Sequence, residues 1–268
     1  MGASKSGTTW FYNLLKNQYN FSKGLRKEYN ALSKIFNTKH IYVSPPKVNG
    51  NTKLAQRVFE FDAKIREISS SVEKYCEYFD EITPPGCMSA DISPSYIGLT
   101  TEHIEAVSAQ FLKRGFDFYV TLFLRDPIER LYSFSSMIMR NRLLSDHLGV
   151  TKNYKLNDVV LHLKSHPEFT TDYIAAIENI ENAKFVSKKF IYPYETLTTA
   201  AGVEDVSLNL ELERLEGFEN KVFHKGNKIT CLSDNMVRLH LRNNLADQYD
   251  YCNSYFRSKK IHINWPYM

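Results

Sequence analysis

A glycine-containing stretch near the start of the chain has the residue types of a phosphate-binding loop. It reads GASKSGTTW over residues 2–10, so that Gly2 and Gly7 have the G-x-x-x-x-G spacing of such loops. The lysine that normally follows the second glycine is replaced by Thr8, and a lysine occurs inside the loop instead, as Lys5. The stretch is therefore either an altered nucleoside triphosphate loop or a loop for a different phosphate.

The residues that follow predict that this loop opens a helix. Apolar side chains recur at positions 10, 11, 14 and 15, which is the spacing of one helix face. At a helix N-terminus, backbone N–H groups and the helix dipole favour a bound anion. Loops of this kind normally follow a buried strand, and whether one precedes the loop stays open.

A second candidate for anion binding lies at the end of the clearest predicted strand. The aromatic and β-branched run FDFYVTLFL, residues 116–124, has the composition of a buried strand and leads into Arg125. Asp126 and Pro127 are suited to begin a helix, which places Ser133 about two turns into it. Ligands of open α/β sheets bind beyond the carboxyl ends of strands. A guanidinium group with a nearby hydroxyl suits a phosphate monoester there.

Helical and strand patterns alternate along the rest of the chain. We expect helices over 53–80 (with a weak break at three serines), 101–115, 157–165, 170–182 and 234–249, and strands within 86–96 and over 188–197. This alternation predicts an α/β fold with a central parallel sheet and helices on both faces. No repeat or flexible linker divides the chain, so residues 1–268 are expected to form a single domain.

Composition narrows the class of protein. The 268 residues carry a formal charge of +4 without a dense basic stripe, which argues against a nucleic-acid partner. No run approaches the roughly 20 apolar residues that span a bilayer, and the chain does not open on a signal-peptide pattern. We therefore expect a soluble, cytoplasmic protein with no membrane partner.

Cysteine and histidine spacing gives no indication of a metal site. The four cysteines include no C-x-x-C pair, which favours buried thiols over zinc or a redox pair and leaves one disulfide open. His162 and His166 lie four residues apart, but no glutamate follows His162, and Pro167 ends the predicted helix. No metal is therefore expected.

The motifs together resemble the sulfotransferases that use 3′-phosphoadenosine 5′-phosphosulfate (PAPS), and most closely their heparan-sulfate and Golgi-type branch. SKSGTTW is similar to the family's 5′-phosphosulfate loop, and LRDPIERLYS, with its R-x7-S spacing, is similar to its 3′-phosphate element. Further similar stretches follow in the family's order: RKEYNAL (26–32), DISPSYI (91–97), YPYETL (192–197) and HKGN (224–227). Ile92 stands near the position where that branch often carries a lysine.

The resemblance implies a P-loop-like three-layer fold and transfer of a sulfuryl group from PAPS to an acceptor hydroxyl, leaving adenosine 3′,5′-bisphosphate. The acceptor is expected to be a glycan, a lipid or a small molecule. Glu28 is implied as the base, and Lys5 as the cation that assists the leaving group. The implied cofactor contacts are Lys5, Ser6, Gly7, Thr8, Thr9, Trp10, Arg125, Ser133, Lys225 and Gly226.

Two other functions remain open from the residues alone: a small-molecule kinase with an altered loop, and a nucleotide-binding module without catalysis. Neighbouring polar residues are interpreted as structural. Asp91 is expected to cap or pair near the site, Tyr194 and Glu195 to support the fold, and Arg140 to face water.

Overall fold

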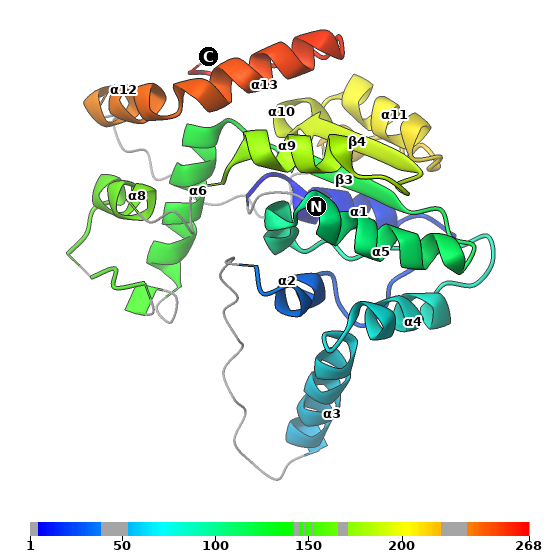
Figure 1. Ribbon diagram of the computed structural model, residues 1–268. Coiled ribbons are helices and arrows are strands. Elements are labelled where there is room, and N and C mark those ends of the chain that lie inside the picture. Colours follow the sequence, from blue (N-terminus) through cyan, green and yellow to red (C-terminus); the bar gives the residue numbers. More distant parts are fainter. Residues whose placement is uncertain are drawn as a thin grey trace.

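The computed structural model describes residues 5–38, 53–141, 145–146, 148–151, 153–165, 171–220 and 235–267. In this part of the chain the protein is a mixed α/β structure that is mostly helical, with two small parallel sheets of two strands each (Figure 1).

The larger sheet pairs β3 (Tyr119–Leu124) with β4 (Lys188–Pro193) in parallel, with Tyr119 opposite Lys188 and Leu124 opposite Pro193. Successive β3 side chains point to opposite faces of the sheet. Leu122 and Leu124 pack into one apolar cluster, and Phe123 packs into another. Both faces of this sheet are therefore covered, as the apolar run predicted.

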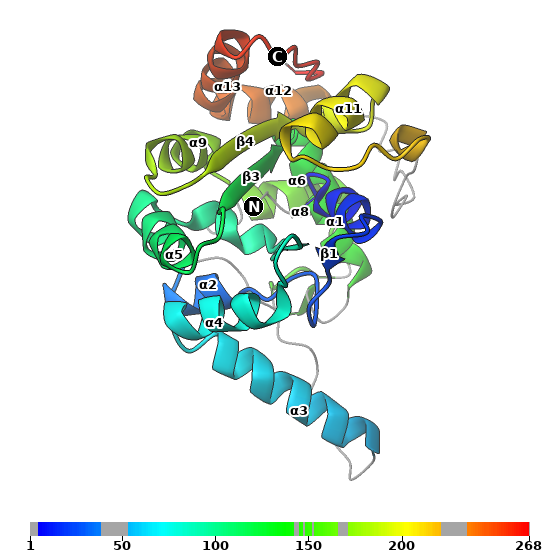
Figure 2. The same ribbon diagram turned by 90° about the vertical axis from the view of Figure 1, so that its right-hand side faces the viewer.

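Helices cover the two faces from opposite sides (Figure 2). Residues of α5 (Thr101–Lys113) and α9 (Tyr173–Asn182) share the cluster of Leu122. Residues of α1 (Thr8–Lys16) and α11 (Ala200–Asn209) share the cluster of Phe123. This arrangement places the N-terminus of α1 near the carboxyl end of β3.

The smaller sheet pairs β1 (Phe21–Ser22) with β2 (Met88–Ser89), also in parallel. A cavity of about 1050 Å³ is lined both by β2 and by the first half of β3. The predicted parallel pairing is confirmed. The described residues nevertheless form two separate sheets, where the sequence predicted one central sheet.

The remaining elements are α2 (Ala31–Ile35), α3 (Lys53–Ile68), α4 (Val72–Ile82), the 3₁₀ helix η1 (Pro94–Gly98), α6 (Pro127–Arg140), α8 (Leu156–Lys164), α10 (Tyr194–Leu197), the 3₁₀ helix η3 (Phe218–Asn220), α12 (Asn235–Asn244) and α13 (Ala246–Ser258). Helix α3 projects away from the rest of the protein in both views (Figures 1 and 2). Within the described ranges, no helix is both long enough and apolar enough to cross a membrane.

Most predicted elements are confirmed, although several of their boundaries differ. The serines between α3 and α4 break the helix because Ser71 caps α4, accepting a hydrogen bond from the backbone N–H of Lys74. The strand predicted over 188–197 ends at Pro193, and the next four residues form α10. The helix predicted over 234–249 is divided into α12 and α13 at Leu245.

Candidate functional site

The predicted phosphate loop leads directly into α1, as its sequence indicated. Gly7 is the N-cap of α1 with a φ of 88°, a conformation that favours glycine. A Cβ built on Gly7 would lie 2.7 Å from Cδ2 of Tyr194. The ring of Tyr194, at the start of α10, therefore packs directly against the loop, and a glycine is needed there for space as well as for φ.

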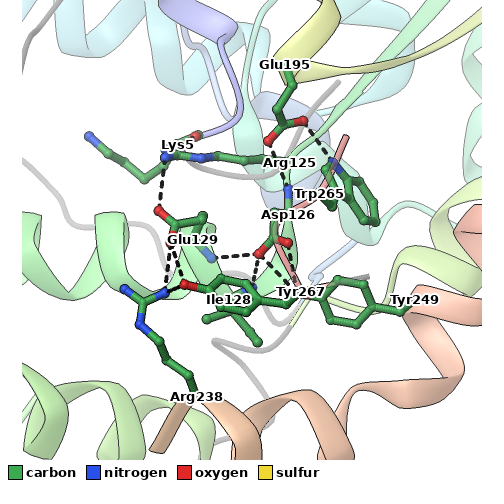
Figure 3. Close-up of polar contacts among 10 residues, drawn as sticks. All are labelled: Lys5, Arg125, Asp126, Ile128, Glu129, Glu195, Arg238, Tyr249, Trp265 and Tyr267. Carbon is green, nitrogen blue, oxygen red and sulfur yellow. Dashed lines mark hydrogen bonds and ion pairs between the residues drawn. The ribbon is translucent and has the colours of Figure 1, made fainter. Parts of the chain in front are cut away.

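Arg125 lies at the carboxyl end of β3 and contacts the loop. Its Nη1 donates a hydrogen bond to the backbone carbonyl of Lys5 at 3.3 Å (Figure 3). Its guanidinium lies 5.2 Å from the ring centroid of Tyr194. Its Nη2 is 3.8 Å from Oε2 of Glu129, one turn into α6. Ser133 follows one turn later, half-buried on the same helix. The two predicted anion-binding elements are therefore adjacent.

A buried network fixes the start of α6 behind Arg125. Asp126 caps the helix, accepting hydrogen bonds at 2.9 Å from the N–H groups of Ile128 and Glu129. The hydroxyl of Tyr249 donates to both of its oxygens at 3.0 Å. Burial raises the pKa of the Asp126 carboxyl, and these hydrogen bonds oppose the rise. The cap therefore ties α6 to α13.

Glu195 extends this network to the C-terminal segment. Its carboxylate accepts hydrogen bonds from the backbone N–H of Asp126 at 3.3 Å and from Nε1 of Trp265 at 2.8 Å (Figure 3). Burial raises its pKa as well. The hydroxyl of Tyr173 donates to the carbonyl of Arg125 at 2.9 Å. The backbone that presents Arg125 is therefore held from α9, α10 and the chain end together.

Glu28 reaches the loop through its neighbour Lys27. Nζ of Lys27 lies 2.6 Å from Oε1 of Glu28, 3.2 Å from Oγ1 of Thr8 and 3.1 Å from Oγ1 of Thr9. The candidate base is thus placed beside the N-terminus of α1. Lys27 lies in the K-E stretch but was not predicted as a site residue, although its position next to the candidate base was an available signal.

The DISPSYI stretch holds this segment in place. Asp91 accepts a hydrogen bond from the backbone N–H of Tyr29 at 3.2 Å and from the hydroxyls of Ser93, at 2.5 Å, and Tyr96. Oγ of Ser93 accepts in turn from the N–H of Asn30 at 2.9 Å. Burial raises the pKa of Asp91 to about 6, although these hydrogen bonds act in the opposite direction.

Positive charge is concentrated around the loop. Partial burial lowers the pKa of Lys5, and the charges of Arg140, Arg125 and Lys27 lower it further. Arg140, at the exposed end of α6, was expected to face water, and its charge nevertheless acts on Lys5. The charges that lower the pKa of Lys5 would attract an anion bound beside it.

The remaining predicted cofactor contacts differ in burial and in whether the structure describes them. Oγ of Ser6 is buried and has no hydrogen-bond partner among the described residues. Because buried polar groups are normally hydrogen-bonded, this hydroxyl is a candidate contact for a polar ligand. Trp10 is 4% exposed and packs edge-on against Phe218 at 5.3 Å between ring centroids, so the structure places it in the core beneath the loop. Lys225 and Gly226 lie outside the described residues.

The described part of the chain contains three free thiols and no cluster of potential metal ligands. No group of three or more His, Cys, Asp or Glu side chains there is placed to hold a metal ion. Cys76 and Cys252 are buried free thiols, as predicted, and Cys87 is a half-buried one. Cys231 lies outside the described residues.

Comparison of the chain with models of protein families, with curated proteins and with solved structures gave no match.

Proposed function

We propose that this protein is a PAPS-dependent sulfotransferase that transfers a sulfuryl group to an acceptor hydroxyl. The observation that carries the proposal is the 3.3 Å contact between Arg125 Nη1 and the Lys5 carbonyl. It brings a phosphate-type loop and a strand-end arginine close enough to bind the two phosphates of one adenosine. The cations near the loop and the Ser6 hydroxyl, which has no partner among the described residues, fit a doubly phosphorylated ligand.

We infer that the fold is of the P-loop-like, three-layer kind. The loop opens α1, β3 and β4 run in parallel, and helices pack on both faces of that sheet. A continuous central sheet would run through the space between β2 and β3, which the cavity now occupies.

Four residues have separate roles in the proposed reaction. PAPS supplies the sulfur electrophile: a bond from the acceptor oxygen to sulfur forms, and the bond from sulfur to the 5′-phosphate oxygen breaks. The Glu28 carboxylate takes the proton of the acceptor hydroxyl. Lys5 stabilises the negative charge that develops on the departing phosphate oxygen. Arg125 and Ser133 bind the 3′-phosphate and fix the orientation.

Calorimetry with adenosine 3′,5′-bisphosphate tests the proposal. Wild-type protein is expected to bind it, and Arg125→Gln is expected to weaken binding about tenfold or more, because a charge-assisted contact to phosphate is lost. Arg257→Gln is the matched control, since Arg257 is an exposed arginine on α13. Tight binding of Mg-ATP together with no binding of the bisphosphate would favour a kinase and overturn the proposal.

A turnover assay then separates catalysis from binding alone. Labelled PAPS is incubated with a panel of hydroxyl acceptors, and the label transferred is measured. Glu28→Gln is expected to lower turnover by about 10² or more while the bisphosphate still binds, since general-base assistance is lost. Binding without transfer to any acceptor in the panel would instead indicate a non-catalytic module.

A further inference from the structure

Lys27 joins the phosphate loop to the candidate base, and all three of its donors are used. A lysine ammonium carries three N–H groups. Its three partners are Oγ1 of Thr8, Oγ1 of Thr9 and Oε1 of Glu28, at 3.2, 3.1 and 2.6 Å. The first two belong to the opening turn of α1, and the third belongs to a segment that lies some twenty residues later.

These contacts are unlike two other short-range lysine–glutamate pairs among the described residues. Lys64–Glu67 and Lys74–Glu77 lie on exposed helix faces, with lysine side chains 38% and 48% exposed. Such surface pairs contribute little. Lys27 is 18% exposed, and its own carbonyl is fixed by the N–H of Ile92 at 2.9 Å. The ammonium is therefore held at the loop by a constrained backbone.

The arrangement also determines what the two threonines can offer a ligand. A hydroxyl oxygen that accepts a hydrogen bond from the ammonium keeps its own O–H group as a donor. Lys27 therefore leaves the hydroxyl hydrogens of Thr8 and Thr9 available to an anion at the N-terminus of α1. A helix N-terminus favours an anion already, and two hydroxyl donors with a nearby cation add to that preference.

The same ammonium fixes Glu28. Lys27 contacts Oε1, which leaves Oε2 as the oxygen that can take a proton from an acceptor. A carboxylate held in this way stays beside the loop, where the electrophile would be bound. Positioning of this kind matters because a displacement of about 1 Å at a reacting group can cost about a hundredfold in rate.

We propose that Lys27 is a positioning residue that couples the two halves of the site. It directs the Thr8 and Thr9 hydroxyls to the 5′-phosphate of the donor, and it holds Glu28 for the acceptor. This inference rests on the proposed function, and its test is chosen so that the two can fail separately.

The test compares Lys27→Met, Lys27→Arg and Lys16→Met by bisphosphate calorimetry and by turnover. Lys16 is an exposed lysine on α1, the helix that carries both threonines, and it serves as the matched control. Lys27→Met is expected to weaken bisphosphate binding about tenfold and to lower kcat about a hundredfold. Lys27→Arg keeps the charge and should recover much of the binding, whereas Lys16→Met should behave like wild type.

A double variant shows whether Lys27 acts through Glu28. If it does, Lys27→Met combined with Glu28→Gln lowers kcat no further than Glu28→Gln alone, because the base that Lys27 positions is already absent. Additive losses in kcat contradict the coupling. Wild-type binding and turnover in Lys27→Met overturn the role of Lys27 and leave the sulfotransferase proposal intact. Failure of the wild-type protein to bind the bisphosphate overturns that proposal itself.

Discussion

Lys5 adopts a backbone conformation that lysine rarely takes, with a φ of 72°. For a residue with a Cβ, this region costs about 1–2 kcal/mol, and such strain tends to occur at functional sites. The sequence predicted Lys5 as a site residue through the resemblance of its loop, and Arg125 through its place at the end of a predicted strand. It could not predict the strained backbone of Lys5 or the contacts of Lys27 with Thr8 and Thr9, because these depend on how distant segments pack in the folded chain.

Asp91 provides a pH test at this scale. Burial raises its pKa to about 6 from an ordinary value near 4, so the folded protein binds this proton more readily than the unfolded chain does. Its contribution to stability is therefore fully present below about pH 4 and is lost as the pH rises through 6. The free energy of unfolding, measured by urea denaturation, should fall over this window relative to that of Asp91→Asn.

Burial also raises the pKa values of Asp126 and Glu195, so these carboxyls change stability with pH in the same direction. The comparison with Asp91→Asn is needed to separate their effect from that of Asp91. Both carboxyls are kept in Asp91→Asn, so the difference between the two curves isolates Asp91. That difference should level off above about pH 7. Curves that run parallel from pH 4 to 7 would show that Asp91 titrates in the folded protein as it does in the unfolded chain.

At the scale of elements, the contact between the loop and α10 depends on a boundary that the sequence misplaced. Residues 188–197 predicted a strand, since Tyr, Phe and Ile favour one. The chain instead turns into α10 at Tyr194, and this turn places the ring against Gly7 and under the guanidinium of Arg125. Helix α6 was predicted correctly because Asp126 and Pro127 are strong local signals.

Substitution of Gly7 measures how closely these elements approach. Gly7→Ala places a methyl group 2.7 Å from the Tyr194 ring at a positive φ. Gly86→Ala is the matched control, because Gly86 also has a positive φ, 78°, with no atom within 4 Å of the added Cβ. Gly7→Ala should therefore destabilise the protein by about 1–3 kcal/mol more than Gly86→Ala in urea unfolding, which is a typical cost of overpacking.

Equal losses in the two alanine variants would mean that the Tyr194 ring moves aside without cost. The affinity of the same two variants for adenosine 3′,5′-bisphosphate, measured by calorimetry, gives a second test. Since the contact shapes the loop, Gly7→Ala should also weaken binding, while Gly86→Ala should leave the affinity unchanged.

At the scale of the whole molecule, the sequence predicted parallel strands with helices on both faces of the sheet, but it did not predict the division into two sheets. Local periodicity identifies strands, whereas their order depends on contacts between distant segments. The network behind Arg125 is also built from distant segments. Asp126 lies 69 residues from Glu195 and 123 residues from Tyr249, and Glu195 lies 70 residues from Trp265. No local pattern marks Trp265 as part of the site's support.

Two tryptophans allow the strength of this network to be measured. Trp265 and Trp10 are 3% and 4% exposed, so each Trp→Phe exchange shrinks a buried ring. Nε1 of Trp265 donates to Glu195 at 2.8 Å, whereas Nε1 of Trp10 has no partner among the described residues. Trp265→Phe should therefore cost about 1–3 kcal/mol more than Trp10→Phe in urea unfolding, since it leaves a buried carboxylate short of a donor. If Trp10→Phe costs as much, ring packing rather than the hydrogen bond joins the C-terminal segment to the start of α6.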